Sequence, residues 1–176
     1  MQNKMAMKEF ASLFSVFFIF LWSALAQEPN RSRGQGYFFF APGLGNRRPG
    51  GNELDIHIGA GGEGFIDKGL GVGVELGPVG PTKHGSSTLG WFDDAVGLGS
   101  ANLSYHFLPS TIDRKFEPFV TAGYSLFFRA GTSSGVNAGW GGNVWMNKNA
   151  ALRFEGRVHA TDLYHFASFR VGMTFR

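Results

Sequence analysis

The sequence contains no cysteine, few charged residues and only one long hydrophobic run. The absence of cysteine from 176 residues excludes a disulfide framework and a metal site built from thiolates. Charged residues make up 16% of the chain and are scattered singly, with a net charge of +3, so nothing in the composition supports nucleic-acid binding. The hydrophobic run covers residues 10–22, and no comparable stretch follows it. If the rest of the chain crosses a membrane, it must therefore do so as β-strands.

The first residues are typical of a secretory signal peptide. Lys4 and Lys8 precede the apolar run, and Ala24 and Ala26 supply small side chains at the cleavage positions. The run is shorter than the roughly 20 residues of a membrane-spanning helix, which makes an uncleaved anchor the weaker alternative. We therefore predict a signal peptide over residues 1–26, an N-terminal extension over residues 27–35 and a single domain over residues 36–176.

Apolar and polar residues alternate along much of the remaining chain, which is the pattern of β-strands whose two faces meet different environments. Eight such segments are predicted, over residues 36–43, 53–62, 69–76, 96–107, 116–130, 135–146, 151–159 and 166–176. Glycine accounts for 27 of 176 residues, about twice its average share of about 7%, and suits tightly curved sheets. We predict an all-β fold, an eight-stranded antiparallel up-and-down barrel.

Charged residues of both signs lie on the polar faces of these strands. They are Asp55, Glu75, Glu117, Arg129, Arg153, Glu155, Arg157 and Arg170. In a soluble barrel they would form a solvated exterior around an apolar cavity, whereas in a membrane barrel they would point into the lumen. The lumen of an eight-stranded barrel is filled by side chains, and buried charges need partners of opposite sign. With Glu63 as a fifth acid, these residues can pair, so the membrane interpretation predicts a charge network in the lumen.

Aromatic residues on the apolar faces favour the membrane interpretation. Tyr37, Phe107, Phe116, Phe128, Trp140 and Phe175 are expected near strand ends, where aromatic girdles meet the membrane interfaces. We therefore predict a transmembrane β-barrel with its apolar faces toward lipid. The alternative is a secreted soluble, lipocalin-like barrel that binds a small apolar ligand.

Residues 116–176 resemble the small OmpA-like and OmpX-like outer-membrane β-barrel domains. The resemblance rests on the segment from Pro118 to Tyr124, a glycine-rich strand ending in Trp145 and Met146, the segment from Leu152 to Arg157 and the aromatic-rich last strand. It implies a monomer in outer-membrane lipid, assembled by the barrel-assembly machinery through its C-terminal strand, with no separate peptidoglycan-binding domain. Family members usually end on the terminal aromatic residue, whereas here Arg176 follows Phe175.

A lipid-modifying enzyme is a further alternative. Its base would be His57, His159 or His165, with Ser168, Asp162 or Asp55 as the neighbouring group. A lumen histidine beside arginine and glutamate is more often a packed partner, and the five histidines show no metal-ligand spacing. The glycine-rich residues 59–64 match the spacing of a dinucleotide-binding loop, but a strand follows them in place of the required helix. We therefore expect no enzymatic activity, no cofactor and no metal.

The predicted function is that of a non-enzymatic outer-membrane barrel with a structural role in the envelope or a role in surface interaction. The longest predicted loop, residues 77–95, falls on the predicted outer side of the membrane. It contains Lys83, His84, Trp91 and Phe92, which are candidates for contacting a partner because exposed aromatic side chains among glycine and serine can anchor one.

Overall fold

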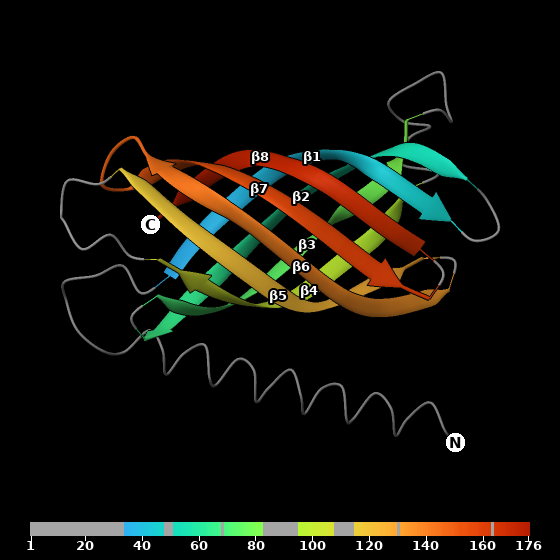
Figure 1. The fold of residues 1–176 in the computed structure, drawn as a ribbon, viewed down its shortest axis with the longest axis horizontal. Helices are drawn as coiled ribbons and strands as arrows, with labels where there is room; N and C mark the ends of the chain where they lie inside the picture. Colours follow the sequence, from blue (N-terminus) through green and yellow to red (C-terminus); the bar gives the residue numbers. More distant parts are fainter. Residues whose placement is uncertain are drawn as a thin grey trace. The chain divides into compact units, whose positions relative to one another are not determined.

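The computed structural model describes residues 34–47, 51–67, 69–82, 95–107, 115–129, 131–162 and 164–176. These residues form a closed barrel of eight strands in which each strand is antiparallel to both neighbours (Figure 1). The strands are β1 (Gly34–Arg47), β2 (Asn52–Asp67), β3 (Leu70–Pro81), β4 (Val96–His106), β5 (Phe116–Phe128), β6 (Thr132–Trp145), β7 (Ala150–Thr161) and β8 (Tyr164–Phe175). Strand β8 pairs with β1 and closes the barrel, so the predicted all-β, up-and-down fold is confirmed.

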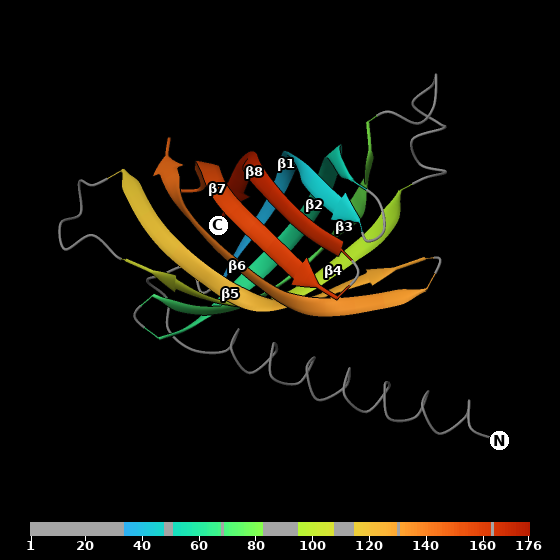
Figure 2. The ribbon, with the colours of Figure 1, turned by 45° about the vertical axis from the view of Figure 1, so that its right-hand side comes forward.

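The strands run obliquely because their register is staggered around the barrel. Following paired residues from Gly36 through all eight strands leads back to β1 at Asn46, ten residues further along. A stagger of this kind tilts the strands against the barrel axis, as the crossing front and back strands in Figure 2 show. As a result, side chains that meet in the lumen come from strands far apart in the sequence.

The two ends of the barrel differ in what they contain. We call one the terminus end, because it holds the start of β1, the end of β8 and the connections β2–β3, β4–β5 and β6–β7, and the other the loop end. In the β6–β7 connection, Asn147 Oδ1 accepts hydrogen bonds from the backbone N–H groups of Asn149 and Ala150, at 2.9 and 2.8 Å. At the loop end, Gly131 (φ 127°) turns the chain from β5 into β6.

Several strands extend beyond their predicted bounds. Strand β1 begins at Gly34, before the predicted start at residue 36, and β2 continues to Asp67 past the predicted end at residue 62. The aromatic run in β1 alternates in the structure, since Tyr37 and Phe39 are buried while Phe38 and Phe40 are exposed. The alternation cannot be recognised from the hydropathy of the sequence, because aromatic side chains occupy both the lumen face and the outer face of β1.

Inward-facing glycines make room for large side chains in the lumen. A Cβ atom on Gly61 would lie 2.8 Å from Glu75 Cγ and 2.9 Å from the Tyr37 ring. A Cβ atom on Gly141 would lie 2.8 Å from the Phe119 ring. Carbon atoms do not pack this closely without displacing their neighbours, so glycine at these positions is a condition for filling the lumen with arginine, glutamate and aromatic side chains.

Replacing Gly61 with alanine is expected to destabilise the barrel by about 1–3 kcal/mol, because the added methyl group overpacks the lumen. The adjacent Gly62 faces outward, and a Cβ there would meet only the Gln35 carbonyl oxygen at 3.5 Å, so Gly62→Ala is a matched control with an expected change within about 0.5 kcal/mol. Urea-induced unfolding in lipid vesicles measures both. Equal effects of the two substitutions would contradict the assignment of the inward face.

Candidate functional site: the polar lumen

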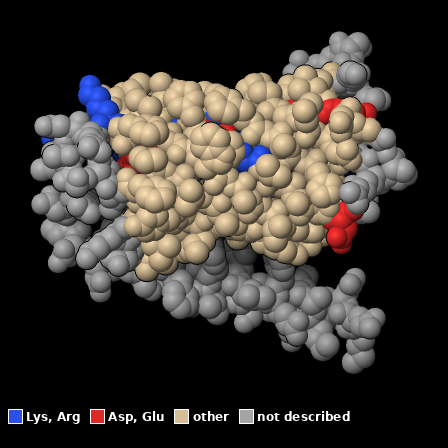
Figure 3. Space-filling model, in the orientation of Figure 1, with Lys and Arg blue, Asp and Glu red and all other residues tan. Residues whose placement is uncertain are grey.

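The barrel is polar inside and apolar outside. The exposed large side chains of the strands are hydrophobic, for example Leu103 (52% exposed) and Phe169 (55%). Among strand residues whose side chains the structure describes, every Asp, Glu, Lys and Arg is buried, apart from the half-buried Glu53. The face drawn in Figure 3 is accordingly tan over most of the barrel, with Lys, Arg, Asp and Glu toward its two ends and in small patches near the middle. This is the arrangement expected of a barrel surrounded by lipid and the reverse of a soluble barrel with an apolar cavity.

The predicted aromatic girdle is correct at four of its six positions. Phe107, Phe116 and Phe175 are exposed at the terminus end, and Phe128 is exposed at the loop end of β5. Two residues differ from the prediction. Tyr37 is buried in the lumen, where its hydroxyl donates to Glu75 Oε1 at 2.9 Å. Trp140 is the most exposed large hydrophobic residue described, at 72%, but it pairs with Gly156 in the middle of β7.

A network of ion pairs fills the middle of the lumen. Glu75 on β3 accepts hydrogen bonds from Arg157 Nη1 at 2.9 Å and from Arg170 Nη1 at 3.0 Å. Glu155 pairs with Arg153 at 3.1 Å and with Arg157 on its own strand. All five side chains are buried, and strands β3, β7 and β8 contribute them. Each charge therefore has a partner of opposite sign, as burial in a narrow lumen requires.

Aromatic rings complete the packing around these arginines. The Arg153 guanidinium lies 4.3 Å from the centre of the Tyr37 ring and 4.0 Å from that of Phe119. The Arg170 guanidinium lies 4.4 Å from the centre of the Phe39 ring. Stacking of this kind fills the space beside a planar cation and adds to its stabilisation.

A second charged cluster lies toward the terminus end. His106 on β4 lies between two carboxylates, with Nε2 at 2.7 Å from Glu63 and Nδ1 at 2.7 Å from Glu117. Glu117 also accepts hydrogen bonds from Trp145 Nε1 at 3.0 Å and from Arg176 at 2.8 Å. The cluster thus ties β2, β4, β5 and β6 to the residue that follows β8. Sequence reasoning did not assign His106 to the network, although its position on the polar face of β4 was a usable signal.

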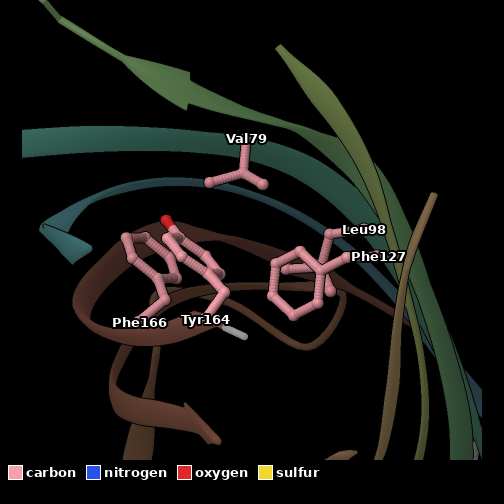
Figure 4. Close-up of a cluster of buried hydrophobic side chains, with 5 residues drawn as sticks. All are labelled: Val79, Leu98, Phe127, Tyr164 and Phe166. Carbon is pink, nitrogen blue, oxygen red and sulfur yellow. The ribbon is translucent and has the colours of Figure 1, made fainter. Parts of the chain in front are cut away.

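The loop end of the lumen is closed by an apolar cluster. It consists of Val79, Leu98, Phe127, Tyr164 and Phe166, which come from four strands and gather inside the barrel (Figure 4). Beneath it, His159 stacks on Phe166 with ring centres 6.1 Å apart and contacts Arg170 at 3.1 Å. Sequence reasoning missed this apolar cluster for two reasons. Val79 and Tyr164 lie outside the predicted strands, which ended at residue 76 and began at residue 166. Leu98, Phe127 and Phe166 face inward, where the alternation predicted polar residues.

No protein-family profile matches the sequence, and no curated protein matches it either. Solved structures of low sequence identity do match the fold. Neisserial surface protein A superimposes with a TM-score of 0.65 at 16% identity, covering 82% of this chain and 97% of that one. The attachment invasion locus protein Ail of Yersinia pestis (TM-score 0.54, 8% identity, 82% and 99% covered) and the outer membrane protein OprG of Pseudomonas aeruginosa (0.54, 11%, 82% and 96%) also match.

The chain has the fold of the small outer-membrane β-barrels. The resemblance to OmpA-like and OmpX-like domains is thereby confirmed, and the fold is that of a transmembrane β-barrel. Within the described ranges, no helix is long and apolar enough to span a membrane.

The structure places seven of the eight predicted network residues inside this barrel, all except Arg129. Six of the seven make the ion pairs described above, and the seventh, Asp55, lies apart from them, where it accepts a hydrogen bond from Tyr164 beside the apolar cluster. Arg129 is exposed just beyond the end of β5, and its guanidinium donates to the Ala95 carbonyl. If β5 continued, the Arg129 side chain would point into the lumen. The strand ends at Phe128, however, and the Arg129 side chain lies outside the lumen.

The candidate catalytic groups are not assembled into one site. His57 and His159 are buried in the lumen, where His159 contacts Ser125 at 2.8 Å and, among the described residues, makes no ion pair with an acid. Asp162 is exposed at the loop end, whereas Ser168 is buried. The remaining candidates that the sequence suggested, Lys83, His84, Trp91 and Phe92 in the long loop, lie outside the described residues.

Proposed function

We propose that this protein is a non-enzymatic outer-membrane β-barrel with a side-chain-filled lumen, which serves envelope integrity or surface interaction. The observation that carries the proposal is the inverted polarity of the barrel, with buried charges and an exposed apolar band. A soluble barrel with this surface would expose a continuous apolar area far larger than soluble proteins tolerate. The lipocalin-like alternative is therefore disfavoured, since its ligand cavity would be the charged lumen.

Two features of the lumen support a closed barrel over an open pore. The network around Glu75 and Glu155 fills the middle, and the apolar cluster that includes Phe127 and Phe166 fills the loop end. An aqueous ion path would have to cross both. Eight-stranded barrels in general have interiors just wide enough for side chains.

The purified protein is accordingly expected to show no stable open channel when inserted into planar lipid bilayers. A larger porin inserted under the same conditions provides the positive control for insertion and recording. Steady conductance in most insertion events would contradict the filled lumen.

A role in surface interaction is supported by the names of two proteins that share the fold. One is a surface protein of Neisseria, and the other is named for attachment and invasion and has been solved with the heparin analogue sucrose octasulfate. For the present protein we propose that the connection between β3 and β4 supplies such a surface, because it contains the predicted contact residues Lys83, His84, Trp91 and Phe92. The predicted loop began at residue 77, but residues 77–81 belong to β3. Non-enzymatic character is supported by the contacts of His57 and His159, since within the described part of the chain neither makes a hydrogen bond or an ion pair to an acid that could orient it.

Fractionation of a Gram-negative host that expresses the full chain tests this proposal. We expect the protein in the outer-membrane fraction, with gel mobility that changes on heating and with a mass that places its N-terminus at Gln27 after removal of the signal peptide. Recovery as a soluble periplasmic species would contradict the proposal and favour the ligand-binding alternative.

A further inference from the structure

The terminus end of the barrel carries a sector of exposed positive charge. Lys115 immediately precedes β5, Lys148 lies in the β6–β7 connection and Arg176 follows β8, and all three are exposed. Backbone hydrogen bonds hold these segments together: the Trp145 N–H donates to the Lys115 carbonyl at 2.7 Å, and the Arg176 N–H donates to the Asn149 carbonyl at 3.0 Å. The three cations therefore occupy the neighbouring ends of strands β5 to β8, and we call them the basic sector.

No exposed Asp or Glu side chain balances the basic sector among the described residues at this end of β5 to β8. The acid next to it in sequence, Glu117, is buried and already accepts hydrogen bonds from Trp145 and Arg176. Within the part of the chain that the structure describes, no ion pair joins Lys115 or Lys148 to an acid. The positive charge of the two lysines is thus available to an external partner.

The position of the basic sector relative to the apolar band indicates what that partner is. Lys115 adjoins the outward-facing Phe116, and Arg176 adjoins the outward-facing Phe175. Aromatic residues at the edge of an apolar band lie at the level of the lipid headgroups, and lysine side chains there extend toward the headgroup region. The ammonium groups therefore lie at the depth where phosphate groups are found.

The loop end has a different charge distribution. The described charges that reach the surface there are Asp162 and Arg129, which are exposed, and the half-buried Glu53. Both signs are present, so this end has no described counterpart of the basic sector. The asymmetry points to a partner on one side of the membrane only.

We propose that the basic sector binds the phosphate groups of anionic phospholipids in the leaflet that surrounds the terminus end. This inference rests on the proposed outer-membrane location, in which the terminus end faces the periplasm. The Arg176 guanidinium is held 3.8 Å from the Trp145 ring centre and pairs with Glu117, so its position is fixed and its charge is largely compensated within the protein. Lys115 and Lys148 supply positive charges on flexible side chains, which can adjust to the position of a lipid headgroup. Each lysine is expected to increase association with anionic lipid roughly fivefold.

Electron paramagnetic resonance with spin-labelled lipids tests the inference on protein purified from the outer-membrane fraction and reconstituted in phosphatidylcholine vesicles. We expect spin-labelled phosphatidylglycerol to associate with the barrel several-fold more than spin-labelled phosphatidylcholine, and this preference to weaken as salt is raised. The double variant Lys115→Gln/Lys148→Gln is expected to lose most of the preference. Arg129→Gln, which removes a cation at the loop end, is the matched control and is expected to retain it.

Equal association of the two lipids with the folded barrel, or an unchanged preference in the double variant, would overturn this inference alone. Heat-modifiable gel mobility establishes that each variant is folded before the lipid measurement. Absence of the unaltered protein from the outer-membrane fraction would instead contradict the proposed function, so the two failures are distinguishable.

Discussion

Replacing Glu75 with glutamine is expected to lower the free energy of unfolding by about 3–5 kcal/mol. Glu75 is the only described carboxylate that Arg157 and Arg170 share at hydrogen-bond distance, at 2.9 and 3.0 Å, and it also accepts the Tyr37 hydroxyl. Its loss leaves positive charge in a buried lumen without compensation, which costs more than the net stabilisation of the pair itself. Urea-induced unfolding in lipid vesicles, followed by tryptophan fluorescence, measures the change.

A second substitution that neutralises one of the arginine partners of Glu75 distinguishes the cost of unbalanced charge from the cost of altered packing. The double variant Glu75→Gln/Arg170→Gln removes one charge of each sign and is expected to recover part of the lost stability. Glu53→Gln is the control for the loss of an acid at a half-buried position with no described ion pair, and it is expected to change stability by no more than about 0.5 kcal/mol. A Glu75→Gln effect as small as that of the control would contradict the lumen network.

An arginine on the outward face is expected to have the second largest effect. Val120 is exposed on β5 within the apolar band, and Val120→Arg should cost roughly 2–4 kcal/mol if the bilayer midplane lies near it. Thr132 is exposed at the loop end of β6, so Thr132→Arg should cost only about 0–1 kcal/mol. Leu126 lies on β5 between Val120 and the loop end, where Phe128 pairs with Thr132, so Leu126→Arg should have an intermediate cost. Urea-induced unfolding in vesicles again gives the three values.

The order of these three costs is the informative result. In a soluble barrel all three positions would be solvated, and each substitution would be nearly neutral. Three equal costs, or a larger cost at Thr132 than at Val120, would contradict an apolar band bounded by the strand ends.

The order and approximate position of the strands could be predicted from the sequence because the period of two is preserved wherever the two environments differ in polarity. The pattern fails where both faces take the same kind of residue, as in the aromatic run from Tyr37 to Phe40. It also fails at Phe127 and Phe166, which face inward with an apolar side chain. Alternation predicts which residues of a strand share a face, but it does not reveal that one end of the lumen is apolar.

The composition of the lumen network could also be largely predicted, but its pairings could not. Glu75 and Arg157 are 82 residues apart in sequence and belong to non-adjacent strands whose side chains meet across the lumen. Their contact depends on the ten-residue stagger of the barrel, which strand patterns do not specify. Arg129 shows that strand ends are also hard to predict. Alternation correctly assigns it to the inward-facing set of β5, but β5 ends at Phe128 and Arg129 therefore lies outside the lumen.

The measurement that tests the account most directly is a cysteine scan of β5. The natural chain contains no cysteine, so each single-cysteine variant carries one nitroxide label at a known position. Labels at Val120 and Ala122 are expected to be accessible to oxygen dissolved in the bilayer, whereas labels at Thr121 and Ser125 should be shielded from it. The opposite phase, or equal exposure of both sets to a water-soluble nickel complex, would contradict a barrel with its charges inside and its apolar face in lipid.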